Sequence, residues 1–189
     1  FPEAHISNNT HSTQQMSESD AQALRKAMKG WGTNEQALID VLADKTNEQL
    51  VALNAMYTKT IERDLIKDIK SETGGHFEDL LVGIITPQAE YDATLVHNAI
   101  KGIGTNESLL SEVLGTRTPT QIKAMNAAYT KLFDVDMLPM WEDDTSGIYQ
   151  KALNLLITSD RAEGQEDEDL EKDVKALYDA GENKLGTNE

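Results

Sequence analysis

An internal repeat constrains this chain more than any other feature of its sequence. The segment MKGWGTNE at residues 28–35 returns as IKGIGTNE at residues 100–107, which is a shift of 72 positions. The same shift superimposes four further pairs of identical residues: Thr46 on Thr118, Gln49 on Gln121, Tyr57 on Tyr129 and Gly75 on Gly147. A fixed period of this length indicates two copies of one structural unit, each with a similar core.

A third copy begins near the end of the chain. The segment AGENKLGTNE at residues 180–189 repeats the Gly-Thr-Asn-Glu ending, and Gly186 follows Gly104 by 82 residues. The ten extra residues fall in the acidic stretch 159–169, which we interpret as a linker. The predicted organisation is a tail at 1–15, a first repeat at 16–86, a second at 87–158, the linker at 159–169 and the start of a third repeat at 170–189.

Each repeat is predicted to contain five helices, and the fold class is all-α, because apolar residues follow helical spacing and no strand-like alternation is present. The expected helices of the first repeat are 20–28, 34–43, 46–59, 60–72 and 76–85. Thr46 with Gln49, and Thr118 with Gln121, have the spacing of a capping box. Pro139 falls early in the fourth helix of the second repeat and should shorten it.

Composition excludes several classes of partner. The net charge is −16, from 17 basic and 33 acidic side chains, so nucleic acid, which is bound through clustered Lys and Arg, is not an expected partner. An anionic membrane would also repel the chain unless a cation bridged the two. The chain has no cysteine and no apolar run of roughly 20 residues, so we expect a cytoplasmic protein without a transmembrane helix.

A carboxylate recurs at a fixed distance from each glycine loop. Glu72 lies 40 residues after Gly32, and Asp144 lies 40 residues after Gly104, each at the predicted end of a fourth helix and before a glycine-containing turn. The last carbonyl groups of a helix lack intrahelical partners, and glycine permits a sharp turn. Calcium takes about 6 to 8 oxygen ligands, so loop carbonyls plus one carboxylate form an incomplete calcium site. An ordinary helix-end acid is the alternative.

Taken together, the paired Lys-Gly-x-Gly-Thr loops, the acid 40 residues on and the five-helix unit resemble the annexin family, over roughly residues 16–189. The resemblance implies calcium-dependent binding to acidic phospholipids, and that the chain is a piece of a longer, four-repeat protein. The family's ligands map onto this chain as follows: the carbonyls of Met28, Gly30 and Gly32 with Glu72; those of Ile100, Gly102 and Gly104 with Asp144; and, in the third repeat, Gly181, Lys184 and Gly186.

The tips of the loops are candidates for membrane contact. Trp31 and Ile103 each lie between two glycines, and Leu185, between Lys184 and Gly186, occupies the same register position in the third repeat. Lys29 and Lys101 precede the first two tips. Membrane interfaces favour a Trp ring with a hydrated N–H, whereas packing of Trp31 within the fold is the alternative. Thr33 and Glu35, with Thr105 and Glu107, are predicted to be helix caps and first-turn acids; their oxygens are also candidates for a secondary calcium site.

Calcium-dependent membrane binding would make the protein peripheral on membranes when calcium rises. Two other functions are alternatives to it. One is a helical-repeat scaffold or cytoskeletal adaptor that binds protein partners, and the polar tail 1–15 is a candidate segment for such a partner. The other is an enzyme. The sequence shows no Ser/His/Asp set, zinc motif or phosphate-cradling loop, so we expect no enzymatic activity.

Overall fold

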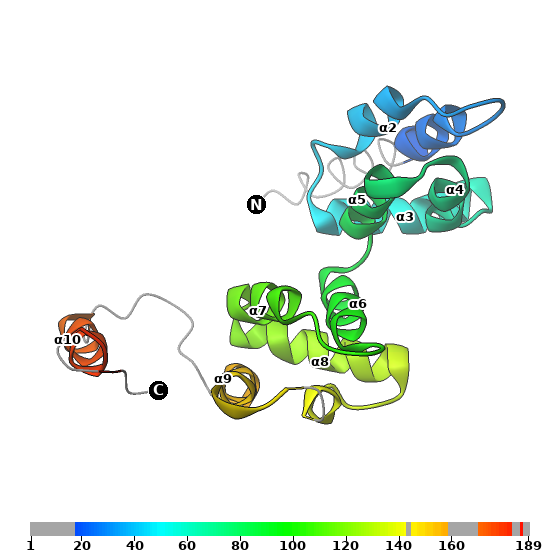
Figure 1. Cartoon of the computed structure of the whole chain (residues 1–189). Helices are drawn as coiled ribbons and strands as arrows, with labels where there is room; N and C mark the ends of the chain where they lie inside the picture. Colours follow the sequence, from blue (N-terminus) through cyan, green and yellow to red (C-terminus); the bar gives the residue numbers. More distant parts are fainter. Residues whose placement is uncertain (1–17, 143–144, 159–169, 183–185, 187–189) are drawn as a thin grey trace, which may run out of the picture. The chain divides into compact units, whose positions relative to one another are not determined.

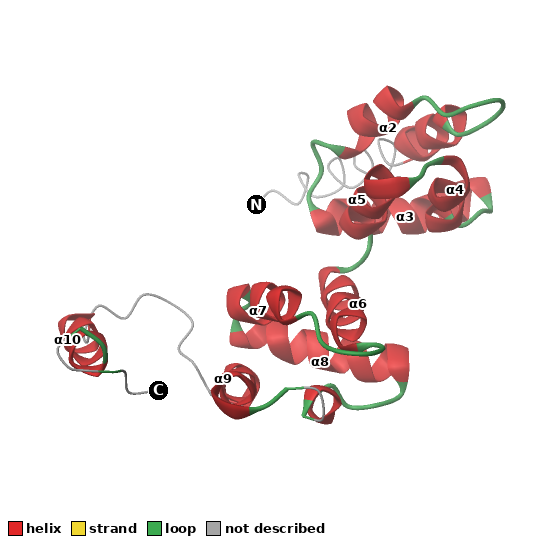
Figure 2. Ribbon diagram, in the orientation of Figure 1, coloured by secondary structure: helices red, strands yellow, loops and turns green. Residues whose placement is uncertain are grey.

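The chain is folded into helices joined by short loops, as seen in a computed structural model that describes residues 18–142, 145–158, 170–182 and 186. Throughout these residues the regular structure is helical (Figure 1 and Figure 2). After a first helix described over 18–27, the elements are α2 (Glu35–Leu42), α3 (Asn47–Ile61), α4 (Leu65–Glu72), α5 (Gly75–Ile85), α6 (Gln88–Ile100), α7 (Glu107–Thr116), α8 (Pro119–Phe133), the 3₁₀ helix η1 (Leu138–Trp141), α9 (Gly147–Thr158) and α10 (Leu170–Ala180). The predicted all-α class is confirmed.

The helices form two compact units, which we call unit 1 (Phe1–Tyr91) and unit 2 (Asp92–Glu189). In unit 1, α4 and α5 pack on each other and both pack on α3. Together with the first helix and α2, these helices enclose one core, whose buried members are Ala21, Leu24, Ala27, Met28, Leu38, Leu42, Leu50, Leu53, Tyr57, Leu65, Ile69, Leu81 and Ile85. A single apolar core of this kind gives the unit its main stabilisation.

The core of unit 2 repeats that of unit 1 position by position. With the exception of Ile85, every core position of unit 1 is matched 72 residues later by a buried apolar side chain. These are Ala93, Val96, Ala99, Ile100, Leu110, Leu114, Ile122, Met125, Tyr129, Met137, Trp141 and Leu153. The repeat seen in the sequence is therefore a repeat of the buried side chains as well as of the loops.

An ion pair also recurs in both units. Lys45 Nζ lies 3.3 Å from a carboxylate oxygen of Asp20 in unit 1. At the same positions of unit 2, the guanidinium of Arg117 donates to both oxygens of the buried Asp92, at 2.6 and 2.9 Å. The two-point contact and the hydrogen bonds that it supplies offset the cost of burying the Asp92 charge.

The predicted caps of the long third helices are confirmed. Thr46 and Gln49 form a capping box at the start of α3, and Thr118 and Gln121 form another at the start of α8, with Pro119 in the first turn. In each, the Thr side chain accepts from the backbone N–H three residues on, and the Gln side chain accepts from the cap residue's own N–H. Each box satisfies two backbone donors that the helix leaves free.

The fourth helix starts later than predicted in unit 1 and is shortened in unit 2. In unit 1 it begins at Leu65, because Glu62 ends α3 in the left-handed conformation (φ 59°) and Asp64 then caps α4. In unit 2 the described part of this segment is the 3₁₀ helix η1, which contains Pro139. Proline has no amide N–H to donate to the preceding turn, so the expected shortening at Pro139 is observed.

Helix α10 presents an apolar stripe to its surroundings. Leu170, Val174, Leu177 and Tyr178 recur at helical spacing, and each is more than half exposed. No residue of α10 is buried against the rest of the described structure. A bilayer-crossing helix is absent from the described residues, since none of their helices is both long enough and apolar enough.

Candidate functional site: the glycine loops

The loop between the first helix and α2 is closed at its base by one backbone hydrogen bond. Asn34 N donates to Ala27 O at 2.9 Å, and the Asn34 side chain accepts from Ala37 N at 3.1 Å to cap α2. In unit 2, Asn106 N donates to Ala99 O at 2.8 Å, and its side chain accepts from Leu109 N at 3.1 Å. The base of the loop is thus built identically in the two units.

This geometry corrects one prediction. Thr33 and Thr105 do not cap the second helices, because the residue that follows each of them, Asn34 or Asn106, holds that position. Asparagine ranks above threonine as a cap. Glu35 and Glu107, the first residues of α2 and α7, are first-turn acids as predicted, where the helix dipole favours negative charge.

Glycine is required in these loops by the backbone, not by lack of space. Gly30 and Gly32 have φ of 119° and 76°, and Gly102 and Gly104 have φ of 110° and 82°. A Cβ added at any of the four would meet nothing within 4 Å. These φ values nevertheless strain any residue with a side chain, so the loop path itself depends on glycine.

The loop carbonyl oxygens are available to a ligand. Met28 and Ile100 anchor the two loops with buried side chains. Among the described residues, no hydrogen bond uses the carbonyl oxygen of any predicted loop ligand in units 1 and 2. Unpaired carbonyls at an exposed turn are acceptors without a partner, and water or a hard cation satisfies them.

The side chains at the loop tips are fully exposed. Trp31 and Ile103 each have a relative exposure of 108%. The alternative in which Trp31 packs within the fold is therefore not what the structure shows. An open hollow of about 580 Å³ lies beside Trp31 and is also lined by Lys26, Lys29 and Glu35.

The structure brings Glu72 to the glycine loop of unit 1. Glu72 is the last residue of α4, and Thr33, the residue that follows Gly32, contacts it directly. Thr33 Oγ1 donates to the main-chain carbonyl of Glu72 at 2.8 Å and lies 3.4 Å from its carboxylate oxygen Oε2. The acid that the sequence spacing singled out thus lies at the edge of the loop, 39 residues from the threonine that reaches it.

The turn after the carboxylate is the same in both units, although Asp144 itself lies outside the described residues. Thr73 ends α4 with hydrogen bonds from its N and Oγ1 to Ile69 O at 2.9 and 2.8 Å. Thr145 makes the equivalent bonds to Trp141 O at 2.8 and 2.7 Å. Gly75 and Gly147 follow with φ of 60° and 63°.

The third loop is described only in part. Gly186 has a positive φ of 89°, as Gly32 and Gly104 have, and Gly181 N donates to Leu177 O at 3.2 Å at the end of α10. Lys184 and Leu185 lie outside the described residues, as do the tail 1–15 and the linker 159–169. Their predicted roles stay predictions.

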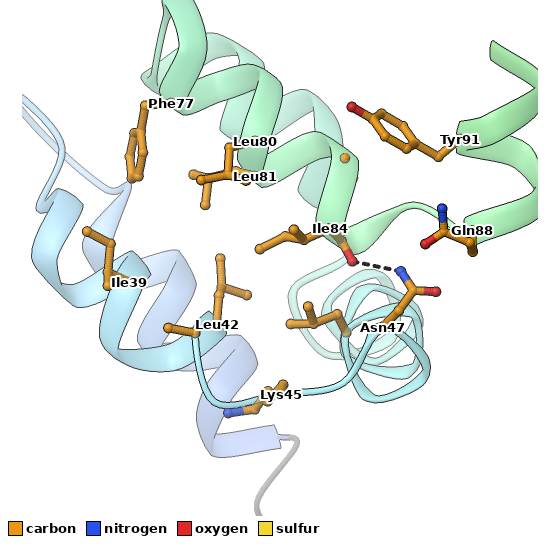
Figure 3. A pocket seen from close by; sticks show the side chains of 13 residues that line it. Ile39, Leu42, Lys45, Asn47, Phe77, Leu80, Leu81, Ile84, Gln88 and Tyr91 are labelled. Atoms are coloured by element: carbon orange, nitrogen blue, oxygen red, sulfur yellow. Dashed lines mark hydrogen bonds between the residues drawn. The ribbon is translucent and has the colours of Figure 1, made fainter. Parts of the chain in front are cut away.

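An apolar cavity of about 490 Å³ lies elsewhere in unit 1, where α2, α5 and the starts of α3 and α6 meet. Figure 3 shows Ile39, Leu42 and Leu81 lining it, with Asn47 donating to the carbonyl of Ile84 at 2.9 Å. Its one cationic lining residue, Lys45, is already paired with Asp20. No carboxylate is among the residues that line this cavity, so it lacks the anionic oxygens that favour a cation.

Clustered metal-ligating side chains are also absent from the described residues, where no three His, Asp or Glu side chains form a group that could hold a metal ion. The predicted loop site does not depend on such a cluster, because its predicted donors are backbone carbonyls with one carboxylate. Oxygen-only donors of this kind suit Ca²⁺ and not the softer transition metals.

Two units with matching cores, matching glycine loops and a carboxylate at the edge of the unit 1 loop define an all-helical repeat protein with exposed glycine loops. The sequence model of the annexin family matches this chain at residues 19–84 and 91–156. The chain belongs to the annexin family.

Individual relatives agree with this assignment. Annexin A4 of Homo sapiens is 42% identical over 172 residues, which cover 90% of this chain and 54% of the relative. The solved structure of chicken annexin V in complex with Zn²⁺ superposes with a TM-score of 0.78 at 38% identity, covering 91% of this chain and 55% of that one. Calcium-bound annexin (Sm)1 gives a TM-score of 0.72 at 30% identity, covering 88% and 48%. The chain spans about half the length of the relatives that it matches.

Proposed function

We propose that this chain binds Ca²⁺ at its glycine loops and attaches through the bound cation to acidic phospholipid membranes. The observation that carries the proposal is the contact between Thr33 and Glu72, which puts a carboxylate beside the loop. In the part of the chain that the structure describes, no donor is bonded to the predicted ligand carbonyls of that loop. Membership of a family that includes the calcium-bound annexin (Sm)1 structure supports the same cation.

In unit 1 the carbonyl oxygens of Met28, Gly30 and Gly32 and the carboxylate of Glu72 would hold the cation. The corresponding set in unit 2 is Ile100, Gly102, Gly104 and Asp144, and the third loop would use Gly181, Lys184 and Gly186. Such a set leaves part of the usual 6 to 8 ligand positions open. A phosphate oxygen of a lipid is the ligand that the proposal assigns to an open position.

Charge explains why the cation is needed. With a net charge of −16 the chain is repelled by an anionic surface. A divalent cation held at the loop cancels this repulsion locally and contributes its own bond to the phosphate. The exposed Trp31 and Ile103, with Leu185 of the third loop, would then enter the head-group region, while Lys29 and Lys101 contact the anionic groups. We accordingly propose a cytoplasmic protein that becomes peripheral on membranes when calcium rises.

Sedimentation with lipid vesicles tests the proposal directly. The chain should sediment with vesicles that contain phosphatidylserine when Ca²⁺ is present, and should stay in the supernatant with EDTA or with vesicles of phosphatidylcholine alone. Glu72→Gln should weaken sedimentation. Asp79→Asn, which removes the same charge from an exposed site on α5, is the matched control and should behave as the unmodified chain. Sedimentation to the same extent with Ca²⁺ and with EDTA would refute the proposal. A chain that stays in the supernatant under both conditions would refute it too and would favour the adaptor alternative.

A further inference from the structure

The hydroxyl of Thr33 joins two segments that the chain keeps far apart. It carries a single hydrogen, which points to the Glu72 main-chain carbonyl at 2.8 Å, with the Glu72 carboxylate as the more distant acceptor at 3.4 Å. The last carbonyls of a helix have no partner within the helix. Thr33 therefore satisfies a helix-end carbonyl of α4 from a loop that precedes α4 by more than thirty residues.

The Thr33 hydroxyl links the loop directly to α4 through a hydrogen bond. Among the described residues, no other hydrogen bond joins residues 28–34 to that helix. The loop is otherwise held at its base, by Asn34 N to Ala27 O, and its tip residue Trp31 has no contact to restrain it. Without the Thr33 hydroxyl, the distance between the loop carbonyls and the Glu72 carboxylate would depend on side-chain packing alone.

Glu72 also occupies an electrostatically unfavourable position. A helix C-terminus carries partial negative charge, so a carboxylate there is disfavoured in the absence of a cation. A hydroxyl directed at this helix end offsets part of that cost and keeps α4 close to the loop. If the loop carbonyls and the Glu72 carboxylate are already held close together, less conformational entropy is lost when they bind a cation.

We propose that Thr33 is a positioning residue for the unit 1 site: its hydroxyl fixes the Glu72 end of α4 against the glycine loop, so that the cation-binding oxygens converge before a cation arrives. The inference rests on the proposed calcium function and assigns Thr33 a role other than ligand or helix cap. Thr105 holds the same position of unit 2, but Asp144 is outside the described residues, so the inference concerns unit 1.

The test compares Thr33→Val, which keeps the shape and removes the hydroxyl, with Thr33→Ser, which keeps the hydroxyl. Calcium is titrated into the full chain without lipid, and the amide NMR signals of Gly30 and Gly32 report on the unit 1 loop. A hydrogen bond of ordinary strength predicts that Thr33→Val raises the calcium dissociation constant about fivefold, whereas Thr33→Ser stays within about twofold. Thr58→Val, which removes a hydroxyl bonded to Asn54 O within α3, is the control and should leave the constant unchanged.

A second arm separates positioning from general stability. If Thr33 acts through Glu72, then Thr33→Val should cost much less calcium affinity in a Glu72→Gln background than in the unmodified chain, because the carboxylate to be positioned is gone. Equal affinity in Thr33→Val and the unmodified chain would overturn the inference, as would an equal loss in Thr33→Val and Thr33→Ser. Failure of the unmodified chain to bind calcium would instead refute the proposed function.

Discussion

The hydroxyl of Tyr57 donates a hydrogen bond of 2.7 Å to the carboxylate of Asp68, one helical turn before Glu72 on α4. Asp68 is buried and also accepts from the guanidinium of Arg63, while Arg25 lies 3.6 Å away. The guanidinium of Arg63, the hydrogen bond from Tyr57 and the charge of Arg25 together lower the pKa of Asp68, against the opposing effect of burial. This buried cluster fixes α4, and hence Glu72, to α3.

Asp68→Ala should destabilise unit 1 by about 1–3 kcal/mol, because it leaves the buried hydroxyl of Tyr57 without its acceptor. The measurement is urea unfolding followed by circular dichroism. Asp79→Ala, at an exposed position on the neighbouring helix α5, should change stability by less than about 0.5 kcal/mol. A loss in Asp68→Ala no larger than that in Asp79→Ala would show that the cluster contributes little.

Unit 2 has a different arrangement of side chains at the positions that correspond to Tyr57 and Arg25. Its tyrosine, Tyr129, lies 3.1 Å from Nδ1 of His97, and the His97 ring stacks on Phe133 with centroids 3.9 Å apart. Burial, and to a lesser extent the charge of Lys101, lowers the pKa of His97 below its ordinary value of 6.5. The unfolded chain therefore binds a proton at this residue more readily than the folded chain does.

The stability that neutral His97 contributes is complete above pH of about 6.5 and is lost as the pH falls through the lower folded-state pKa. His97→Gln removes this proton uptake. We expect the variant to be less stable than the unmodified chain at pH 7.5, by an amount that shrinks at pH 5.5, and urea unfolding at the two values measures it. A stability difference that grows at the lower pH would contradict the assigned direction of the pKa shift.

Two helical glycines should respond in opposite ways to alanine. Gly115 in α7 has nothing within 4 Å of an added Cβ, so Gly115→Ala should stabilise by roughly 0.5–1 kcal/mol through helix propensity. A Cβ at Gly83 in α5 would lie 2.9 Å from the ring of Tyr91, so crowding should cancel or reverse the same gain. Thermal unfolding of the two variants tests the pair, and an equal gain in both would mean that Tyr91 moves freely.

The two tryptophans should give separable fluorescence. Trp31 is fully exposed, whereas Trp141 is buried and its Nε1 donates to Asn154 at 3.0 Å. In a Trp141→Phe background, emission should be that of a hydrated indole without calcium and should shift to the blue when calcium and acidic vesicles are added together. An emission maximum that stays in place while the protein sediments with vesicles would show that Trp31 does not enter the membrane.

Sequence reasoning recovered the features that depend on local spacing. The repeat offset, the helices and the capping boxes at Thr46 and Thr118 follow from patterns within a few residues of each other or from a single period. The break at Glu62 was missed, because a non-glycine residue ends α3 there in a left-handed conformation that no glycine or proline signals. Asn34 was overlooked as a cap although it recurs as Asn106 in the second repeat.

The sequence singles out the candidate residues of the site but not the contacts between them. Constant spacing singled out Glu72 with its loop, since both recur together. The bond from Thr33 to Glu72 joins residues 39 positions apart, and it exists only because the packing of α4 in the core brings its end to the loop. The residues next to Thr33 in the sequence do not indicate whether its hydroxyl caps the helix that follows it, α2, or bonds to α4.

Because each glycine loop is closed at its base, the side chain at its tip can contact a surface without taking part in the packing of the fold. Asn34 and Asn106 close the loops three residues after the tips, and the side chains at positions 31 and 103 are fully exposed. The first repeat has Trp31 at this position and the second has Ile103. Replacing one of these residues by the other therefore removes no internal contact. Evolution can therefore vary the residue offered to a surface at each loop independently, and a chain of such repeats can acquire a different surface preference at every repeat while its core sequence stays constant.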